Sequence, residues 1–363
     1  MKPIRIALLF AQSDANATLS YQHSWPRALS ESSQFKCSLF NLAGRSLLDT
    51  AGMATQIASG TFDAIVMLHS TFSNCQELRR LLFHVVARVR VPKAYFIGNE
   101  YKLMPEKIDF CRKLGVTLLI SQSNDEQVLN LYRDALDCRV ASIPNTGIDQ
   151  AIFFPTTELS ERRLDIGYRS FDSPWYLGNN EKLEISDYFQ ANADRLKLKV
   201  NISMDIESRF DAVGYAGFLN QCRGQISTEP GGDFFELTDN VRLRVNAYMN
   251  SHPNATWSEV KSQFFSNYGP SIPMRIISGR HVEAAACKTV QILFEGRYNG
   301  YFQPDEHYIP LQKDFGNIDE VMYKFRDDSY CERIINNAYD VVRSDLTYDR
   351  LIDKFSAEMR EIL

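Results

Sequence analysis

Residues 278–296, SGRHVEAAACKTVQILFEG, combine groups that could hold a phosphorylated ligand. Ser278 is of a type that begins helices, and Gly279 lets a ligand approach the backbone closely. A helix start offers unpaired N–H groups and partial positive charge, and Arg280 adds a fixed cation that fits phosphate oxygens. One turn inside, the Glu283 carboxylate could accept hydrogen bonds from sugar hydroxyls. The stretch predicts a nucleotide-sugar site, with the diphosphate at the helix end and the ribose on Glu283. The alternative is an ordinary surface helix with an early acid.

The elements that would position this helix form an alternating pattern. Short apolar runs alternate with amphipathic segments through the first part of the chain. Continuous apolar strands that alternate with helices predict a parallel sheet covered on both faces, and hence a Rossmann-like domain over residues 1–145. The runs predicted as strands are 4–10, 35–42, 63–69, 93–100, 116–123 and 139–145.

A break in the pattern divides the chain. Pro144, Gly147 and Pro155 interrupt regular structure, which predicts a linker over residues 146–160. The alternation then restarts, and a second Rossmann-like domain is expected over 161–345, with a helical insertion from about Thr238 to Pro270. Residues 346–363 are expected to form a terminal helix that packs back on the first domain. Two such α/β domains predict an interdomain cleft, where ligands bind at the carboxyl ends of the strands.

Composition narrows the class of protein. The 363 residues are 44% hydrophobic and 23% charged, which is typical of a globular chain, and a net charge of −5 argues against a dedicated nucleic-acid binder. Seven scattered cysteines without a CxxC pair indicate reduced thiols, and the six histidines show no zinc-ligand spacing. The first apolar run is too short for a signal peptide, and no run approaches the roughly 18 residues that span a bilayer. A cytoplasmic protein is expected.

The carboxyl-terminal half resembles the GT-B glycosyltransferases. Retaining members carry Glu-Ala-x-Ala-x-Gly-x-Pro-Val, and this chain has EAAACKTVQI from Glu283, with Lys288 where glycine is usual and Val290 where proline is usual. The segment IPNTGIDQAIFFP is similar to the family's linker. FEGRYNGYFQPDEHYIPLQKDF is similar to the tail of bacterial spore-coat and capsule-cluster enzymes. The resemblance covers roughly residues 144–348; the first half is similar only in its order of strands and helices.

One catalytic position departs from the family pattern. Retaining members place a first glutamate eight residues before the second, and Arg275 stands there in this chain. Glu229, which follows an apolar run, is a candidate replacement if the segment after it is an insertion. Gly231 and Gly232 would then expose N–H groups to a sugar or phosphate. The alternative is a plain glycine turn beside an exposed acid, and retaining or inverting stereochemistry stays open.

The resemblance also implies basic residues that bind the donor phosphates. The family's first loop in this domain often supplies them, and here that loop is LDIGYRSFDSPWYLGNNEK. Arg169 is the main candidate and Lys182 the second. Either side chain could instead be an ordinary solvated charge.

The first domain is expected to hold the acceptor and any general base. An inverting transferase needs a group that removes the proton of the acceptor hydroxyl. His23, His69 and Glu100 follow or end predicted strands, so they lie at the edge that faces the cleft in this architecture. A structural hydrogen-bonding role is the alternative for each.

These expectations together describe a cytoplasmic glycosyltransferase of the hexosyl or deoxyhexosyl class, possessing at most peripheral contact with the inner face of a membrane. It would move a sugar from a nucleoside-diphosphate sugar to a glycan or lipid-linked acceptor, in surface polysaccharide or related glycoconjugate synthesis, with no cofactor, no essential metal and no nucleic-acid partner. Two alternatives are a catalytically inactive transferase-like binding protein and a periplasmic-type binding protein, which the lack of a signal peptide disfavours.

Overall fold

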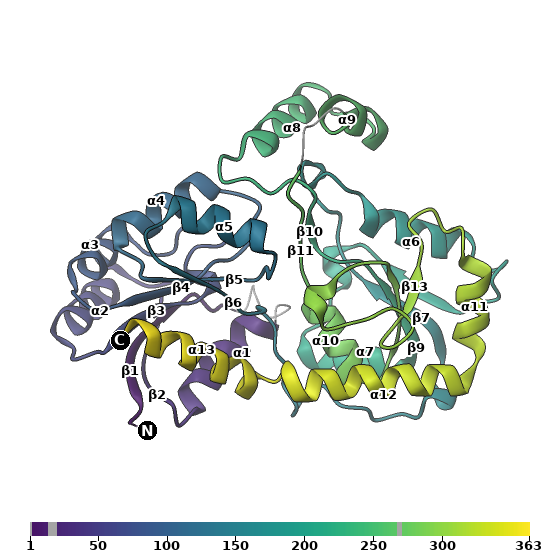
Figure 1. Ribbon diagram of the computed structural model, residues 1–363, viewed down its shortest axis with the longest axis horizontal. Coiled ribbons are helices and arrows are strands. Elements are labelled where there is room, and N and C mark those ends of the chain that lie inside the picture. The colour runs from purple at the N-terminus through teal and green to yellow at the C-terminus, as the bar shows by residue number, and fades with distance from the viewer. Residues whose placement is uncertain (1, 14–19, 267–270) are drawn as a thin grey trace. The chain divides into compact units, whose positions relative to one another are not determined.

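The computed structural model describes residues 2–13, 20–266 and 271–363, and the chain divides into two compact units (Figure 1). Unit 1 comprises Met1–Asn145, Phe235–Asn240 and Tyr348–Leu363; unit 2 comprises Thr146–Phe234 and Val241–Thr347. The segment expected as a linker, 146–160, is grouped with unit 2. Most of the terminal segment, from Tyr348 onward, is grouped with unit 1.

Unit 1 is built on a six-stranded parallel sheet with the order β2-β1-β3-β4-β5-β6. Its strands are β1 (Ile4–Phe10), β2 (Phe35–Asn41), β3 (Ala64–Met67), β4 (Lys93–Phe96), β5 (Leu118–Ser121) and β6 (Arg139–Ser142). Its helices are α1 (Ser20–Glu31), α2 (Leu47–Ser59), α3 (Arg80–Arg88), α4 (Met104–Leu114), α5 (Glu126–Ala135) and α13 (Tyr348–Ile362). Every residue of β3, β4 and β5 is buried, because helices cover both faces of the sheet.

Unit 2 has a five-stranded parallel sheet with the order β13-β12-β9-β7-β8. Its strands are β7 (Leu164–Arg169), β8 (Val200–Ser203), β9 (Cys222–Ser227), β12 (Val290–Phe294) and β13 (Ile309–Leu311). Its helices are α6 (Glu181–Ala191), α7 (Ala212–Gln221), α8 (Asn240–Ser251), α9 (Trp257–Phe264), α10 (Gly279–Ala286), α11 (Ile318–Arg326) and α12 (Asp328–Asp345). Asn240 itself, the first residue of α8, is grouped with unit 1. The two sheets confirm the expected pair of Rossmann-like domains.

A separate two-stranded antiparallel sheet follows β9 in unit 2. Strands β10 (Gly231–Gly232) and β11 (Met274–Arg275) form it, and α8 and α9 lie between them in the sequence. These helices share an apolar cluster with aromatic neighbours, centred on Val241, Val245 and Val260. The insertion expected from the sequence is therefore a helical hairpin; residues 267–270, at its expected end, lie outside the described residues.

Candidate functional site

Helix α10 begins at the carboxyl edge of the unit 2 sheet. The chain leaves this edge at the end of β9, and α10 then returns it to the opposite edge, where the parallel strand β12 starts. The start of α10 is fixed by the protein itself: the Ser278 N–H donates to Nδ1 of His281 over 3.1 Å. Burial lowers the pKa of His281 to about 3, so its ring is neutral. The pair positions the first turn, and His281 acts here as a structural residue.

Three cations gather beside this helix start. Arg280 is the second residue of α10, Lys182 the second of α6, and Arg209 follows β8. Lys182 Nζ and Arg209 Cζ lie 4.5 and 4.6 Å from the centroid of the Phe171 ring, so one aromatic ring contacts two cations. We call Lys182, Arg209 and Arg280 the cation cluster.

The cation cluster is electrostatically unbalanced. Burial, followed by the charges of Arg280, Arg209 and Arg275, lowers the pKa of Lys182 to about 7. Burial and Arg280 likewise lower the pKa of Arg209. Among the described residues no carboxylate forms an ion pair with these three cations. The Arg280 Nε is buried without a hydrogen-bond partner. Clustered cations without carboxylates suit an anionic ligand with several oxygens.

Glu181, the acid that precedes Lys182 in the sequence, pairs with other cations. Its carboxylate pairs with Arg275 at 3.0 Å and with Lys313 at 2.6 Å, and it accepts a hydrogen bond from Thr228. Burial acts to raise the pKa of Glu181, but Arg275 and Lys313 hold it below its ordinary value. Arg275 also pairs with Asp233 at 2.7 Å. Arg275, which replaces the family's first glutamate, is therefore a structural cation in this chain.

Glu283 lies one turn into α10, as the sequence predicted. It is buried, and a Cβ placed on Gly279 would lie 3.4 Å from its Oε1 atom. The same Cβ would lie 3.2 Å from the methyl group of Thr146. A carboxylate thus lies directly behind the helix start, where a larger residue at position 279 would be in close contact with Glu283 and Thr146.

Glu229 and the glycine pair have partners within the protein. The Glu229 Oε1 accepts the N–H of Tyr298 over 2.5 Å, so this acid holds the loop after β12, and burial raises its pKa. Gly231 has φ +114°, and a Cβ there would lie 1.9 Å from the Met274 carbonyl oxygen. Gly231 and Gly232 pair with β11, which accounts for both glycines without a ligand. Their ligand roles stay predictions.

Arg169 ends β7 and turns to the protein rather than to the cation cluster. Its guanidinium donates to the carbonyl oxygens of Tyr168, Asn201 and Ser208. It also lies over the Phe218 ring, 4.4 Å from the centroid. This geometry favours Arg209 over Arg169 as a ligand-binding cation, although no motif in the sequence indicated Arg209.

In unit 1, both carboxylate oxygens of Glu100 accept hydrogen bonds from the protein. Its Oε1 accepts the N–H of Gln122 at 2.8 Å, and its Oε2 accepts the hydroxyls of Ser121 and Tyr132 at 2.7 Å each. Burial raises the pKa of Glu100. Since three donors already occupy its oxygens, this residue fits a structural role better than that of a base.

The two candidate histidines of unit 1, His23 and His69, each keep a buried ring nitrogen without a partner. His69 lies among Tyr21, Trp25 and Phe96 at the end of β3, and burial lowers its pKa to about 3. His23 Nδ1 lies 2.6 Å from the Gln12 amide nitrogen, which places the ring proton on Nε2. The Nε2 atoms of both rings are buried and unpartnered. A ligand hydroxyl would satisfy either atom.

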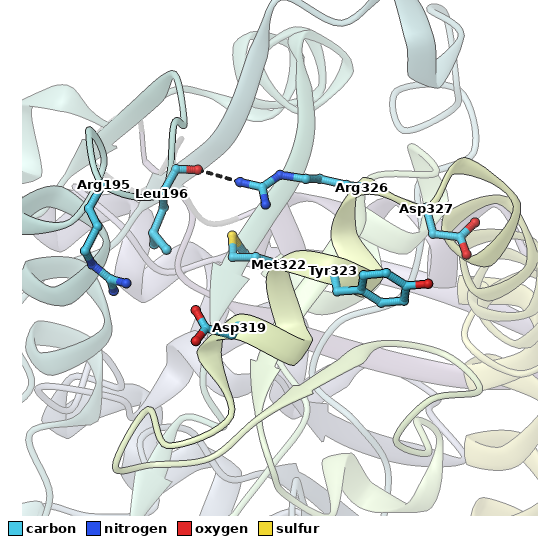
Figure 2. Close-up of a pocket in the computed structure, with 7 residues that line it drawn as sticks. All are labelled: Arg195, Leu196, Asp319, Met322, Tyr323, Arg326 and Asp327. Atoms are coloured by element: carbon cyan, nitrogen blue, oxygen red, sulfur yellow. Dashed lines mark hydrogen bonds between the residues drawn. The ribbon is translucent and has the colours of Figure 1, made fainter.

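A surface pocket lies elsewhere on unit 2. It has a volume of about 540 Å³ and is lined by residues of α11 and of the segment after α6 (Figure 2). Arg326 spans it and donates to the carbonyl oxygen of Leu196 over 2.8 Å. None of the predicted site residues lines this pocket. Within the described ranges, no group of three His, Cys, Asp or Glu side chains is arranged to hold a metal ion.

Comparisons of sequence find no match: no family model and no curated protein corresponds to this chain. Comparisons of structure find several similar proteins. Sucrose-phosphate synthase from Thermosynechococcus elongatus superposes with a TM-score of 0.59 at 11% identity, over 99% of this chain and 98% of that one. BGT of phage T4, in complex with its UDP-glucose substrate, gives 0.57 at 11% identity over 99% of both chains.

A third similar structure is HepE of Anabaena in complex with UDP and glucose. Its TM-score is 0.53 at 12% identity, over 99% of this chain and 100% of that one. Identities at this level bear on the fold, because one fold hosts several functions. The chain therefore has the GT-B fold of these glycosyltransferases, as the resemblance of its carboxyl-terminal half implied.

Proposed function

We propose that this protein is a glycosyltransferase that moves a sugar from a nucleoside-diphosphate sugar to a glycan or other hydroxyl-bearing acceptor. The observation that carries the proposal is the cation cluster beside the start of α10. Lys182, Arg209 and Arg280 come from segments that follow three strands at one edge of the sheet. They meet where open parallel sheets bind ligands.

The cluster fits the charge change of glycosyl transfer. When the bond between the sugar and the diphosphate breaks, negative charge develops on the departing phosphate. Arg280 and Lys182, together with the N–H groups of the first turn of α10, are held in place before the reaction, so they stabilise that charge without reorganisation. In this proposal these cations neutralise the diphosphate, and the chemistry needs no further cofactor.

The donor is proposed to be a uridine diphosphate sugar. Two proteins of the same fold are described in complex with UDP or UDP-glucose. Glu283 lies behind the helix start, where we propose that it accepts hydrogen bonds from donor hydroxyls. The sugar class and the acceptor, a surface glycan or a lipid-linked precursor, are part of this proposal.

Unit 1 would bind the acceptor. A general base works best with a pKa near the working pH, and burial holds the pKa of His69 at about 3. We therefore propose that His69 orients a hydroxyl through its unpartnered Nε2 atom rather than removes a proton, and that His23 contacts the acceptor through its own unpartnered Nε2. Glu100 is left with the structural role that its three donors indicate.

A second candidate function is a transferase-like protein that binds nucleotide sugars without turning them over. The observation that favours it is the buried pairing of Arg275 with Glu181 at the position where retaining members have a catalytic glutamate. This alternative uses the same cation cluster, so binding alone does not separate the two.

The test measures nucleotide binding and nucleotide release with a panel of uridine and guanosine diphosphate sugars. The lead proposal expects release of nucleotide from at least one donor, and strongly reduced release in both Arg280→Gln and Glu283→Ala. Binding without release with every acceptor mixture would favour the second candidate. If neither binding nor release occurs with any donor, both candidates are wrong.

A further inference from the structure

Helix α2 begins with two leucines that point into solvent. Leu47 and Leu48 are 80% and 85% exposed, which is the highest exposure among the large apolar residues of the described chain. Ser46 and Asp49 fix this helix start through a reciprocal capping box. The leucines are therefore presented on a defined first turn. Adjacent, fully exposed leucines are unfavourable in water unless another surface covers them.

Exposed arginines lie at the same end of the neighbouring helix. Helices α2 and α3 pack against each other, and each follows a parallel strand, so both begin at the carboxyl edge of the unit 1 sheet. Arg79, Arg80 and Leu81 are exposed at the start of α3. Arg45 is exposed just before α2. We call Arg45, Leu47, Leu48, Arg79, Arg80 and Leu81 the α2–α3 patch.

The arginines of this patch outnumber its acids: the one carboxylate in the first turn of α2 is Asp49, whose pKa is lowered by its bonds to Ser46 and, to a smaller extent, by the charge of Arg45. In the described part of the chain, Arg45, Arg79 and Arg80 form no ion pair. The outward positions that follow along α2, Ala51, Gly52 and Thr55, carry no charge. A chain with a net charge of −5 thus has a local surface with three exposed arginines, one acid and three exposed leucines.

We propose that the α2–α3 patch docks on the surface of a lipid bilayer that contains anionic lipids. Arginines near such a surface are attracted by its negative potential, while the two leucines enter the boundary between headgroups and acyl chains. A second copy of this chain fits less well, because a two-fold interface on this patch would bring arginines against arginines. The inference goes beyond the proposed function and does not depend on it.

The experiment is flotation of the full chain with lipid vesicles at low ionic strength. We expect binding to phosphatidylcholine vesicles that contain about one-third phosphatidylglycerol, and little binding to phosphatidylcholine alone. Arg79→Gln/Arg80→Gln should weaken binding about thirtyfold, at roughly a factor of five per arginine. Leu47→Gln/Leu48→Gln should weaken it about tenfold, and added salt should release the wild type.

A matched control replaces two exposed apolar residues of unit 2. Leu243→Gln/Tyr323→Gln should float like the wild type, and circular dichroism checks that every variant is folded. Equal binding by Leu47→Gln/Leu48→Gln and wild type would overturn the inference. So would a failure of the wild type to bind anionic vesicles. If sedimentation instead shows a wild-type dimer that Leu47→Gln/Leu48→Gln abolishes, the patch belongs to a second copy. No outcome depends on nucleotide turnover, so the proposed function is tested separately.

Discussion

Replacing Lys182 by methionine should stabilise the folded protein and weaken donor binding. In the folded chain the Lys182 ammonium is buried beside Arg280 and Arg209, which lowers its pKa from 10.5 to about 7. A pKa difference of that size means that the charged Lys182 side chain destabilises the folded state by roughly 5 kcal/mol relative to the neutral side chain. Methionine has a similar length and no charge, so it removes this cost while it keeps most of the packing.

The pH dependence has a definite sign. Below about pH 7 both folded and unfolded chains carry the Lys182 charge, so the wild type bears the full cost. Between about 7 and 10.5 the folded chain has released this proton while the unfolded chain keeps it, and stability rises with pH. The excess stability of Lys182→Met should therefore be greatest at and below pH 7 and shrink as the pH approaches 10.5.

The assay pairs urea unfolding over a pH series with calorimetric titration of UDP-glucose. UDP-glucose is the probe because its diphosphate does not titrate near neutral pH. We expect Lys182→Met to unfold at higher urea near pH 7 and to bind UDP-glucose about 10- to 100-fold more weakly. In the wild type, affinity should fall as pH rises through 7; in Lys182→Arg, which stays charged, it should not. A less stable Lys182→Met, or unchanged affinity, would refute the reasoning.

Three further predictions follow from single contacts. Arg280→Gln should weaken UDP-glucose binding by about 10- to 100-fold, measured by calorimetry, because it removes charge-assisted hydrogen bonds; unchanged affinity would place the diphosphate elsewhere. Gly231→Ala should lower the free energy of unfolding by at least about 2 kcal/mol, because its φ is positive and its Cβ meets the Met274 carbonyl. Gly217→Ala, in open space on α7, is the control and should cost nothing. His69→Phe should keep or raise the melting temperature and reduce turnover, since the ring keeps its aromatic neighbours but loses both nitrogens, including the unpartnered Nε2; normal turnover would show that Nε2 contacts no substrate.

The order of strands and helices was predictable because burial on both faces leaves continuous apolar runs in the sequence. The motif that begins at Glu283 was informative even where it departs from the family. Lys288, which stands where glycine is usual, has φ +50°, a backbone conformation that glycine adopts at no steric cost. The local geometry of the family is thus kept although the residue differs.

Which residues form the cation cluster could not be predicted from the sequence pattern. Arg209 and Lys182 both contact the Phe171 ring, and no spacing in the sequence records that shared contact. Its position after a predicted strand was the only available signal. Arg169 has the same signal, yet its guanidinium turns to backbone carbonyls. Which way a long side chain turns depends on packing, and periodicity does not encode it.

The measurement that tests the central claim most directly is hydrogen–deuterium exchange with UDP-glucose. In the free protein, His281 and Val282 donate their N–H groups to Ser278, whereas the N–H groups of Gly279 and Arg280 have no partner within the helix. UDP-glucose and inorganic pyrophosphate should both slow exchange in peptides that cover residues 278–282, and uridine should not. Slowed exchange elsewhere, with residues 278–282 unchanged at saturating UDP-glucose, would contradict a diphosphate site at the start of α10.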